Sequence, residues 1–276
     1  MSDSALFTKD TDSFVFDEGH RRAADFSGSK LPQVTLLFWI MKICATTLGE
    51  TAGDMFSRTM QFGYLASSML LLAVFLTTLV AQLSARRFHP FLFWALILST
   101  STAGTTISDF VDRTLGRGYA SGSTILAGLL LVVFVAWKLT GLPLSVEHIR
   151  SRKTETLYWT AILISNALGT ALGDCLADGS SLDFAGGAGV LAFVLALLAI
   201  LAYTTRISHV LLFWLAFIIT RPFGATMGDV LTKEPLEGGL GLGTLGSSAV
   251  LFAILFVLVV YTTSKKNWPS GRNPAA

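Results

Sequence analysis

Four aspartates in apolar sequence follow a tryptophan at a constant distance. Each lies fifteen residues after its tryptophan, and the pairs are Trp39/Asp54, Trp94/Asp109, Trp159/Asp174 and Trp214/Asp229. Successive tryptophans lie 55, 65 and 55 residues apart, so the pairs mark an internal repeat. A charge inside a membrane is costly and usually handles ions or protons, so the pattern predicts a functional role for these carboxylates.

The chemistry of such a set is the binding of hard cations or protons. Four carboxylates at one level cannot all stay ionised alone, because like charges and desolvation favour the protonated form. Compensation would come from bound cations, from protons, or from the internal bases Lys42 and Arg221. Oxygen ligands prefer Mg²⁺, Ca²⁺ or Mn²⁺ to Zn²⁺ or Cu⁺. We therefore expect one shared ion or metal site formed by Asp54, Asp109, Asp174 and Asp229.

Each aspartate ends a polar stripe on its predicted helix. Residues four and eight positions earlier share roughly one helix face with it. These positions add the candidate ion ligands Thr46, Glu50, Ser101, Thr105, Asn166 and Thr170. The fourth stripe holds Arg221 and Ala225 instead, and Lys42 extends the first stripe by one turn. Such stripes are typical of helices that line a polar path through a membrane.

The stripes are not equivalent. Glu50, Asn166 and Arg221 each occur in one repeat only. A plain four-fold pore would not need such differences, whereas a carrier that couples one off-axis ion to protonation would. Lys42 and Arg221 would then serve coupling or charge compensation. A static structural pair of Glu50 with Lys42 or with Arg221 is an equal alternative.

Small residues recur four positions apart beside the stripes. The pairs are Gly49/Gly53, Gly104/Ser108, Gly169/Gly173 and Gly224/Gly228, and each pair ends directly before its aspartate. Small-x-x-x-small pairs let membrane helices approach each other closely. We expect them to bring the four carboxylates together.

The composition is that of a polytopic membrane protein. The chain has 276 residues, of which 52% are hydrophobic and 14% charged, and its mean hydropathy is +0.63. Soluble domains carry about 25% charged residues. Its apolar stretches are long enough to cross a hydrocarbon core of about 30 Å as helices. The predicted spans are 34–56, 61–84, 90–110, 120–140, 156–176, 184–204, 209–230 and 243–263.

An even number of spans places both termini on one side of the membrane. Fourteen Lys and Arg residues lie on the terminal side and four on the other, which predicts cytoplasmic termini. The polar, acidic N-terminal segment has no early apolar run, so no cleaved signal peptide is expected.

Two spans per repeat predict repeats of one orientation. We expect an all-α fold of eight transmembrane helices, arranged as four parallel helical hairpins with pseudo-four-fold, two-by-two symmetry about the membrane normal. The first helix of each hairpin would line the axis and the second would face lipid. The predicted units are an N-terminal tail 1–33, repeats 34–84 and 90–140, a linker 141–155, repeats 156–204 and 209–263, and a C-terminal tail 264–276.

The tryptophans predict the depth of each aspartate. Each begins a first span beside another aromatic residue, which favours anchoring at the cytoplasmic interface of the bilayer. Fifteen residues at about 1.5 Å each place the aspartates roughly 22 Å farther along, in the outer half of the membrane. Asp112, Asp178 and Asp183 follow near the outer mouth, as a source of negative potential or as solvated loop charges.

The repeated tryptophan and the G-x-x-x-[GS]-D cluster resemble a bacterial membrane family. This family is a four-fold tandem repeat of unknown function with a tryptophan in each repeat. The likeness rests on Trp39, Gly49, Gly53 and Asp54 and their equivalents, and departs at Ser108 and at Pro222 within a span. It implies the architecture and no activity. In addition, the segment Glu50–Asp54 is similar to acidic Gly-Asp motifs of manganese and calcium exporters.

We expect a transporter of a small cation, with a hard divalent metal such as manganese as the leading substrate and proton coupling as a variant. Alternatives in this class are a cation or proton channel and an organic-cation carrier, for which Phe56, Phe110 and Tyr119 are aromatic candidates. A membrane enzyme or sensor is the alternative of another class. We expect no enzyme, because no Ser/His/Asp set, zinc-protease motif or nucleotide-binding loop is present.

The expected partners follow from the same composition. They are the lipid bilayer, the small cation and protons, with no nucleic acid and no covalently bound cofactor. A second copy of the chain, in a homo-oligomer, is a further candidate partner.

Overall fold

The computed structural model describes residues 35–85, 88–142, 152–178, 183–205 and 207–267. The predicted N-terminal tail lies outside these residues, as do 143–151 of the predicted linker and 268–276 of the predicted C-terminal tail. The described part is helical throughout and contains no strand. Its long helices are α2 (Leu36–Asp54), α3 (Gly63–Ser84), α4 (Pro90–Asp109), α5 (Gly118–Leu139), α6 (Arg152–Asp178), α7 (Asp183–Thr204), α8 (His209–Thr232) and α9 (Thr244–Asn267).

Local signals begin and end these helices near the predicted positions. Thr35 caps α2 by accepting a hydrogen bond from the backbone N–H of Phe38, and Pro90 occupies the first turn of α4. Two short π-helical segments, Met55–Thr59 and Phe110–Thr114, extend α2 and α4. Gly63 then begins α3 with a φ of 73°, a conformation that glycine adopts without a steric penalty.

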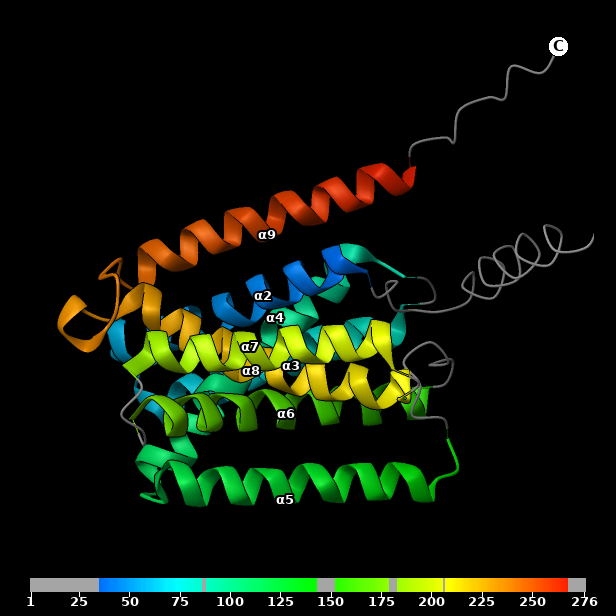
Figure 1. The fold of residues 1–276 in the computed structure, drawn as a ribbon, viewed down its shortest axis with the longest axis horizontal. Coiled ribbons are helices and arrows are strands. Elements are labelled where there is room, and N and C mark those ends of the chain that lie inside the picture. Colours follow the sequence, from blue (N-terminus) through cyan, green and yellow to red (C-terminus); the bar gives the residue numbers. More distant parts are fainter. Residues whose placement is uncertain (1–34, 86–87, 143–151, 179–182, 206, 268–276) are drawn as a thin grey trace, which may run out of the picture.

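Seven of the described helices are long and apolar enough to cross a membrane, which is consistent with a multi-pass membrane protein. The eighth, α2, has 19 residues and contains three charged ones, Lys42, Glu50 and Asp54. All three side chains are buried inside the protein. The helices run side by side along one direction (Figure 1).

Four helices form an inner ring. The first helix of each repeat packs against the first helix of the next, so α2 contacts α4, α4 contacts α6, and α6 contacts α8. The ring closes because α8 packs against α2. In the most apolar stretches of α4, α6 and α8, 50% to 72% of the residues are buried. The inner ring therefore holds the core of the protein.

The outer helices α3, α5, α7 and α9 are mostly exposed, in agreement with the predicted division. Only 17% to 28% of their most apolar stretches is buried. Each packs mainly against the inner helix of the following repeat: α3 on α4, α5 on α6, α7 on α8, and α9 on α2. The predicted hairpins are thus interlocked rather than self-contained, because each inner helix is covered by the preceding repeat.

Candidate functional site

Glycines set the spacing within the inner ring. A Cβ atom on Gly49 would lie 2.3 Å from Oγ of Ser101, and one on Gly224 would lie 2.4 Å from Oγ1 of Thr46. These stripe residues therefore pack against a small residue of the preceding inner helix, and α8 precedes α2 around the ring. The same close packing joins five further pairs of residues. They are Gly53/Thr105, Gly104/Asn166, Gly169/Arg221, Gly173/Ala225 and Gly228/Glu50.

These contacts are in register from helix to helix, so the four inner helices run parallel. The predicted packing role of the small residues agrees with this geometry. Ser108 departs from the pattern, because its buried hydroxyl donates a hydrogen bond of 3.2 Å to Oδ2 of Asp112. Asp112 is itself buried and packs against Gly122 of α5, so it is not a solvated mouth charge.

Aromatic side chains close one end of the ring. The aromatic residue before each tryptophan packs on the tryptophan of the next repeat, with ring centroids 5.8 to 5.9 Å apart. The four pairs are Phe38/Trp94, Phe93/Trp159, Tyr158/Trp214 and Phe213/Trp39. We refer to these eight residues as the aromatic layer.

The aromatic layer corrects the predicted role of the tryptophans. Trp94, Trp159 and Trp214 are 5%, 0% and 6% exposed and therefore do not reach lipid. Only Trp39 is partly exposed. Each indole packs on an aromatic residue of the neighbouring repeat, because the parallel helices bring these large side chains to one level, where packing removes them from solvent.

Lys42 lies one turn beyond the aromatic layer. Its side chain is fully buried, and its ammonium group lies 4.0 Å from the centre of the Phe217 ring. Its Nζ has no hydrogen-bond partner among the described residues. Lys42 therefore does not pair with Glu50, which removes one of the two static pairs considered from the sequence.

Arg221 and Glu50 form the other pair at the centre of the ring. Nη2 of Arg221 donates to Oε2 of Glu50 at 3.1 Å and to Oγ1 of Thr170 at 2.8 Å. Oγ1 of Thr105 also accepts a hydrogen bond from this guanidinium. The hydroxyls of Thr105 and Thr170 donate hydrogen bonds to Oε2 of Glu50 at 3.1 and 3.2 Å. Backbone carbonyls of Thr46 and Ser101 accept the remaining bonds at 3.0 and 3.2 Å. We call this set the central network, and it joins all four inner helices.

Three predicted ligands are buried among the inner helices. Oγ1 of Thr46 bonds to the carbonyl of Lys42 at 3.0 Å on its own helix. Asn166 donates to Oγ1 of Thr100 at 3.0 Å, between α6 and α4. The hydroxyl of Ser101 is buried without a partner among the described residues. None of the three lines the cavity described below.

The four aspartates lie at the other end of the ring, and basic residues separate them. Arg58 contacts Asp54 at 3.1 Å and Asp109 at 3.4 Å. Arg113 contacts Asp109 at 2.8 Å and Asp174 at 3.6 Å, and Lys233 contacts Asp229 at 3.8 Å. These four acids and three bases form the aspartate layer. The sequence reading missed the bases as site residues, although each follows its aspartate by four positions, the spacing of neighbours on a helix face.

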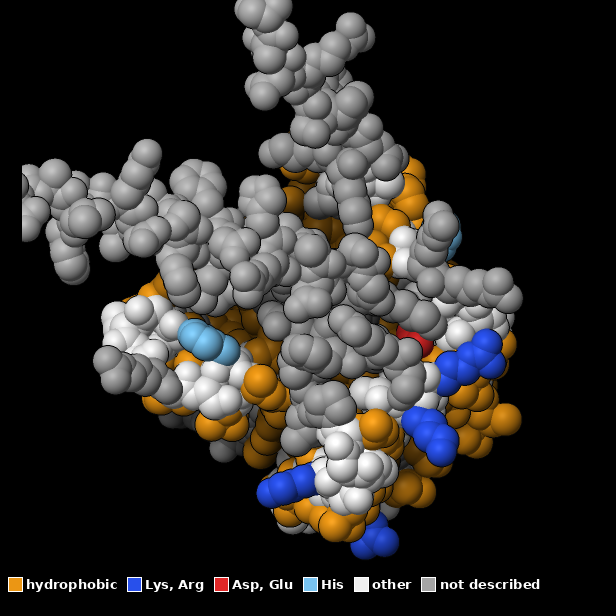
Figure 2. Space-filling model, turned by 90° about the vertical axis from the view of Figure 1, so that its right-hand side faces the viewer, with side chains coloured by type: hydrophobic (Ala, Val, Ile, Leu, Met, Phe, Trp, Pro, Cys, Tyr) orange, Lys and Arg blue, Asp and Glu red, His pale blue; other side chains and the backbone are white. Residues whose placement is uncertain are grey.

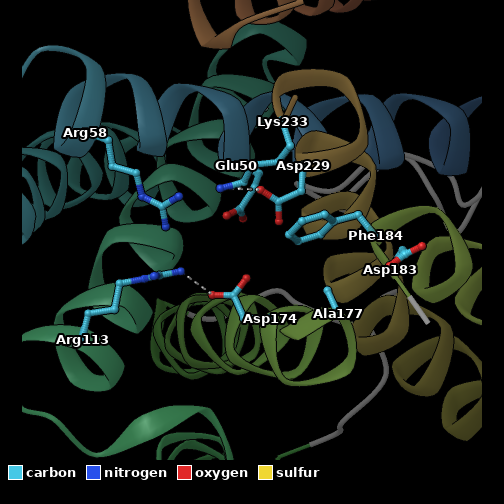
Figure 3. A pocket seen from close by; sticks show the side chains of 9 residues that line it. All are labelled: Glu50, Arg58, Arg113, Asp174, Ala177, Asp183, Phe184, Asp229 and Lys233. Carbon is cyan, nitrogen blue, oxygen red and sulfur yellow. Dashed lines mark ion pairs between the residues drawn. The ribbon is translucent and has the colours of Figure 1, made fainter. Parts of the chain in front are cut away.

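A cavity of about 360 Å³ opens at the aspartate layer. The guanidinium groups of Arg58 and Arg113 enter it from one side, and the carboxylates of Asp174 and Asp229 face it from the other (Figure 3). The ring of Phe184 lies beside Asp229, whereas the carboxylate of Asp183 points away. The complete lining is Glu50, Arg58, Arg113, Asp174, Ala177, Asp183, Phe184, Asp229 and Lys233.

The aspartate layer does not have the geometry of a shared metal site. Within the described ranges, no group of three His, Cys, Asp or Glu side chains is placed to hold a metal ion. Arg58 and Arg113 stand between the carboxylates instead, since each lies within ion-pair distance of two aspartates.

The four segments that contain these layers match a family model. The model is described as a Repeat of Unknown Function (DUF347), and it matches residues 37–88, 92–142, 157–208 and 212–267. The chain belongs to this family. The four matches confirm the four tandem repeats that the tryptophan and aspartate spacing predicts. Comparison with curated proteins and with solved structures gave no match.

Proposed function

We propose that this member of the family is a membrane carrier for a small cation. The observation that supports the proposal is the charge of the aspartate layer, where four buried carboxylates face only three bases. With all groups ionised, the layer carries one uncompensated negative charge at the wall of an open cavity. A monovalent cation or a proton would neutralise it, because an unpaired buried charge is costly.

The net charge of the aspartate layer favours a monovalent cation over the divalent metal that we expected from the sequence. A divalent ion would leave an excess of positive charge in the aspartate layer, whereas one single charge completes it. Arg58 and Arg113 also occupy the space between carboxylates that metal ligation would require. The proposal therefore retains cation transport and prefers a monovalent substrate to manganese.

The closed interior favours a carrier over a channel. Three layers follow one another from the cavity toward the other end of the ring. They are the central network, the contact of Lys42 with Phe217, and the aromatic layer. Arg221, Lys42 and Trp159 are each fully buried, so these layers leave the cavity open at one end only. Transport then requires a rearrangement that opens the aromatic end, which is the property of a carrier.

The proposed topology has eight transmembrane helices in a bacterial inner membrane, with both termini in the cytoplasm. It counts α2 as the eighth span, enclosed by the other helices, and treats the repeats as related by pseudo-four-fold symmetry. The excess of Lys and Arg on the terminal side supports the orientation. At the aromatic end, basic side chains are visible among the described residues (Figure 2). The cavity then opens to the outside.

Flux in proteoliposomes tests the proposal. Methylammonium, guanidinium, sodium and proton fluxes would be measured with the native chain and with Asp174→Asn and Asp229→Asn. We expect uptake of at least one monovalent cation, with a loss of about ten-fold or more in either variant, as for removal of one charged hydrogen bond. Glu234→Gln is the control, because Glu234 is exposed and does not line the cavity. Equal fluxes in native and empty vesicles would overturn the proposal.

A further inference from the structure

Three carboxylates that line the cavity each use only one oxygen in their bonds to described residues. Every bond to Glu50 goes to Oε2, the bond to Asp174 goes to Oδ2, and the bond to Asp229 goes to Oδ1. The second oxygen of each group has no hydrogen bond or ion pair with a described residue. Glu50, Asp174 and Asp229 are 4%, 6% and 5% exposed, and all three line the cavity. Since no described residue donates to these second oxygens, a ligand in the cavity can donate hydrogen bonds to them.

The third repeat lacks the base that follows the aspartate in the other repeats. Arg58 bridges the aspartates of α2 and α4, and Arg113 bridges those of α4 and α6. The equivalent position in the third repeat, four residues after Asp174, is Asp178. No described base bridges the aspartates of α6 and α8, and both of these aspartates line the cavity.

The remaining walls suit an organic cation rather than a bare ion. Phe184 of α7 presents its ring beside Asp229, 5.8 Å from the ammonium group of Lys233, and aromatic faces attract ammonium and guanidinium groups. The carboxylates are not arranged as ligands of one metal ion. A volume of about 360 Å³ accommodates a small organic molecule and far exceeds one ion.

We propose that the cavity binds an organic cation with several N–H donors, a guanidinium or a primary ammonium, between Asp174 and Asp229. The ligand group takes the place of the base that the third repeat lacks, as Arg58 and Arg113 do at the preceding interfaces. This assignment names the substrate class of the carrier proposed above and in that sense rests on it. Binding is nevertheless measurable without transport.

Calorimetric titration of the purified full-length chain in detergent tests the binding site. The probes are methylguanidinium, methylammonium, tetramethylammonium, sodium and Mn²⁺. We expect methylguanidinium to bind best and tetramethylammonium not to bind, because tetramethylammonium has the same charge but no N–H donor. Equal affinity for tetramethylammonium and methylguanidinium, or binding of Mn²⁺ alone, would overturn the assignment.

A variant that places a base at position 178, where the third repeat lacks one, gives the most direct test of the site. Asp178→Arg restores the pattern of the first two repeats, so its guanidinium should occupy the site and weaken methylguanidinium binding about ten-fold or more. The matched variant Asp178→Asn removes the same carboxylate without adding a base and should bind within about three-fold of the native chain. Native affinity in Asp178→Arg contradicts the proposal. Asp174→Asn provides a second route to the same loss if Asp178→Arg does not fold.

The two proposals fail in different ways. Saturable methylguanidinium binding without flux in proteoliposomes supports the site and rejects the carrier. Flux of sodium or protons without methylguanidinium binding supports the carrier and rejects the assigned substrate class.

Discussion

The two ends of the inner ring are made by the same repeat but have opposite character. At the aromatic layer, each repeat supplies an aromatic residue and a tryptophan, and four equivalent contacts close the ring. At the aspartate layer, each repeat supplies an aspartate, but the base that follows is absent from the third repeat. The regular end is sealed, whereas the irregular end holds the cavity. Repetition thus builds the scaffold, and the departure from repetition occurs at the end that holds the cavity.

The largest expected effect is the loss of a tryptophan from the sealed end. Trp159→Ala removes a fully buried side chain and should reduce the free energy of unfolding by about 3–5 kcal/mol. Trp39→Ala is the matched control, since the side chain of Trp39 is only partly buried and should cost less. Melting curves of the two variants in detergent give the comparison. Equal losses in the free energy of unfolding would contradict the view that burial of the tryptophans determines their contribution to stability.

A comparable effect is expected between the two ends, at the central network. Arg221→Met leaves the buried carboxylate of Glu50 without its base and should destabilise the protein by about 3–5 kcal/mol. The double variant Arg221→Met/Glu50→Gln should recover part of this loss, because it removes both charges. Chemical or thermal unfolding of the single and double variants measures the coupling. An additive result would contradict a direct pair.

An intermediate effect is expected where glycine brings α8 against α2. Gly224→Val would place Cβ 2.7 Å from Cβ of Thr46, and such overpacking typically costs about 1–3 kcal/mol. Gly128→Val on α5 is the matched control, because no atom lies within 4 Å of its added Cβ. Size-exclusion profiles and melting temperatures of the pair are the readout. Destabilisation by both variants alike would indicate a general cost of valine rather than a close helix contact.

The smallest effect is expected at Lys42. Its ammonium group has no hydrogen-bond partner among the described residues, and its one specific contact is with the Phe217 ring. Lys42→Met keeps the length of the side chain and removes the cost of a buried charge, so stability should change by no more than about 1 kcal/mol or rise. A loss of flux in this variant, with stability retained, would separate a transport role from a structural one.

The positions of the helices could be predicted from the sequence, because membrane length and apolar runs determine them locally. Observed α3 covers residues 63–84 against the predicted 61–84, and α8 covers 209–232 against 209–230. The small-residue pairs likewise predicted close packing of the inner helices. The interlocking of repeats was not predicted, since periodicity alone does not distinguish an outer helix that covers its own repeat from one that covers the next.

The candidate site was predicted in part. The four aspartates do lie at one level, and Glu50 lines the same cavity. Arg58, Arg113 and Lys233 lie beyond the predicted ends of their spans, at residues 56, 110 and 230. In the structure, α8 continues to Thr232, and the π-helical segments hold Arg58 and Arg113 one turn beyond their aspartates. This extra turn changes four isolated acids into acids paired with bases.

The sequence by itself determined the four repeats, the helices and the residue types at each level, because spacing along a helix fixes which side chains share a face. Only the tertiary structure decided which groups meet. Closure of the parallel ring pairs every helix with the following repeat, so Arg221 reaches Glu50 across the α8–α2 contact, far away in the chain. The same closure packs each tryptophan on an aromatic residue of the neighbouring repeat and leaves Asp174 and Asp229 without a described base that bridges them. Contacts between helices depend on their order around the ring, and this order is a property of the folded chain.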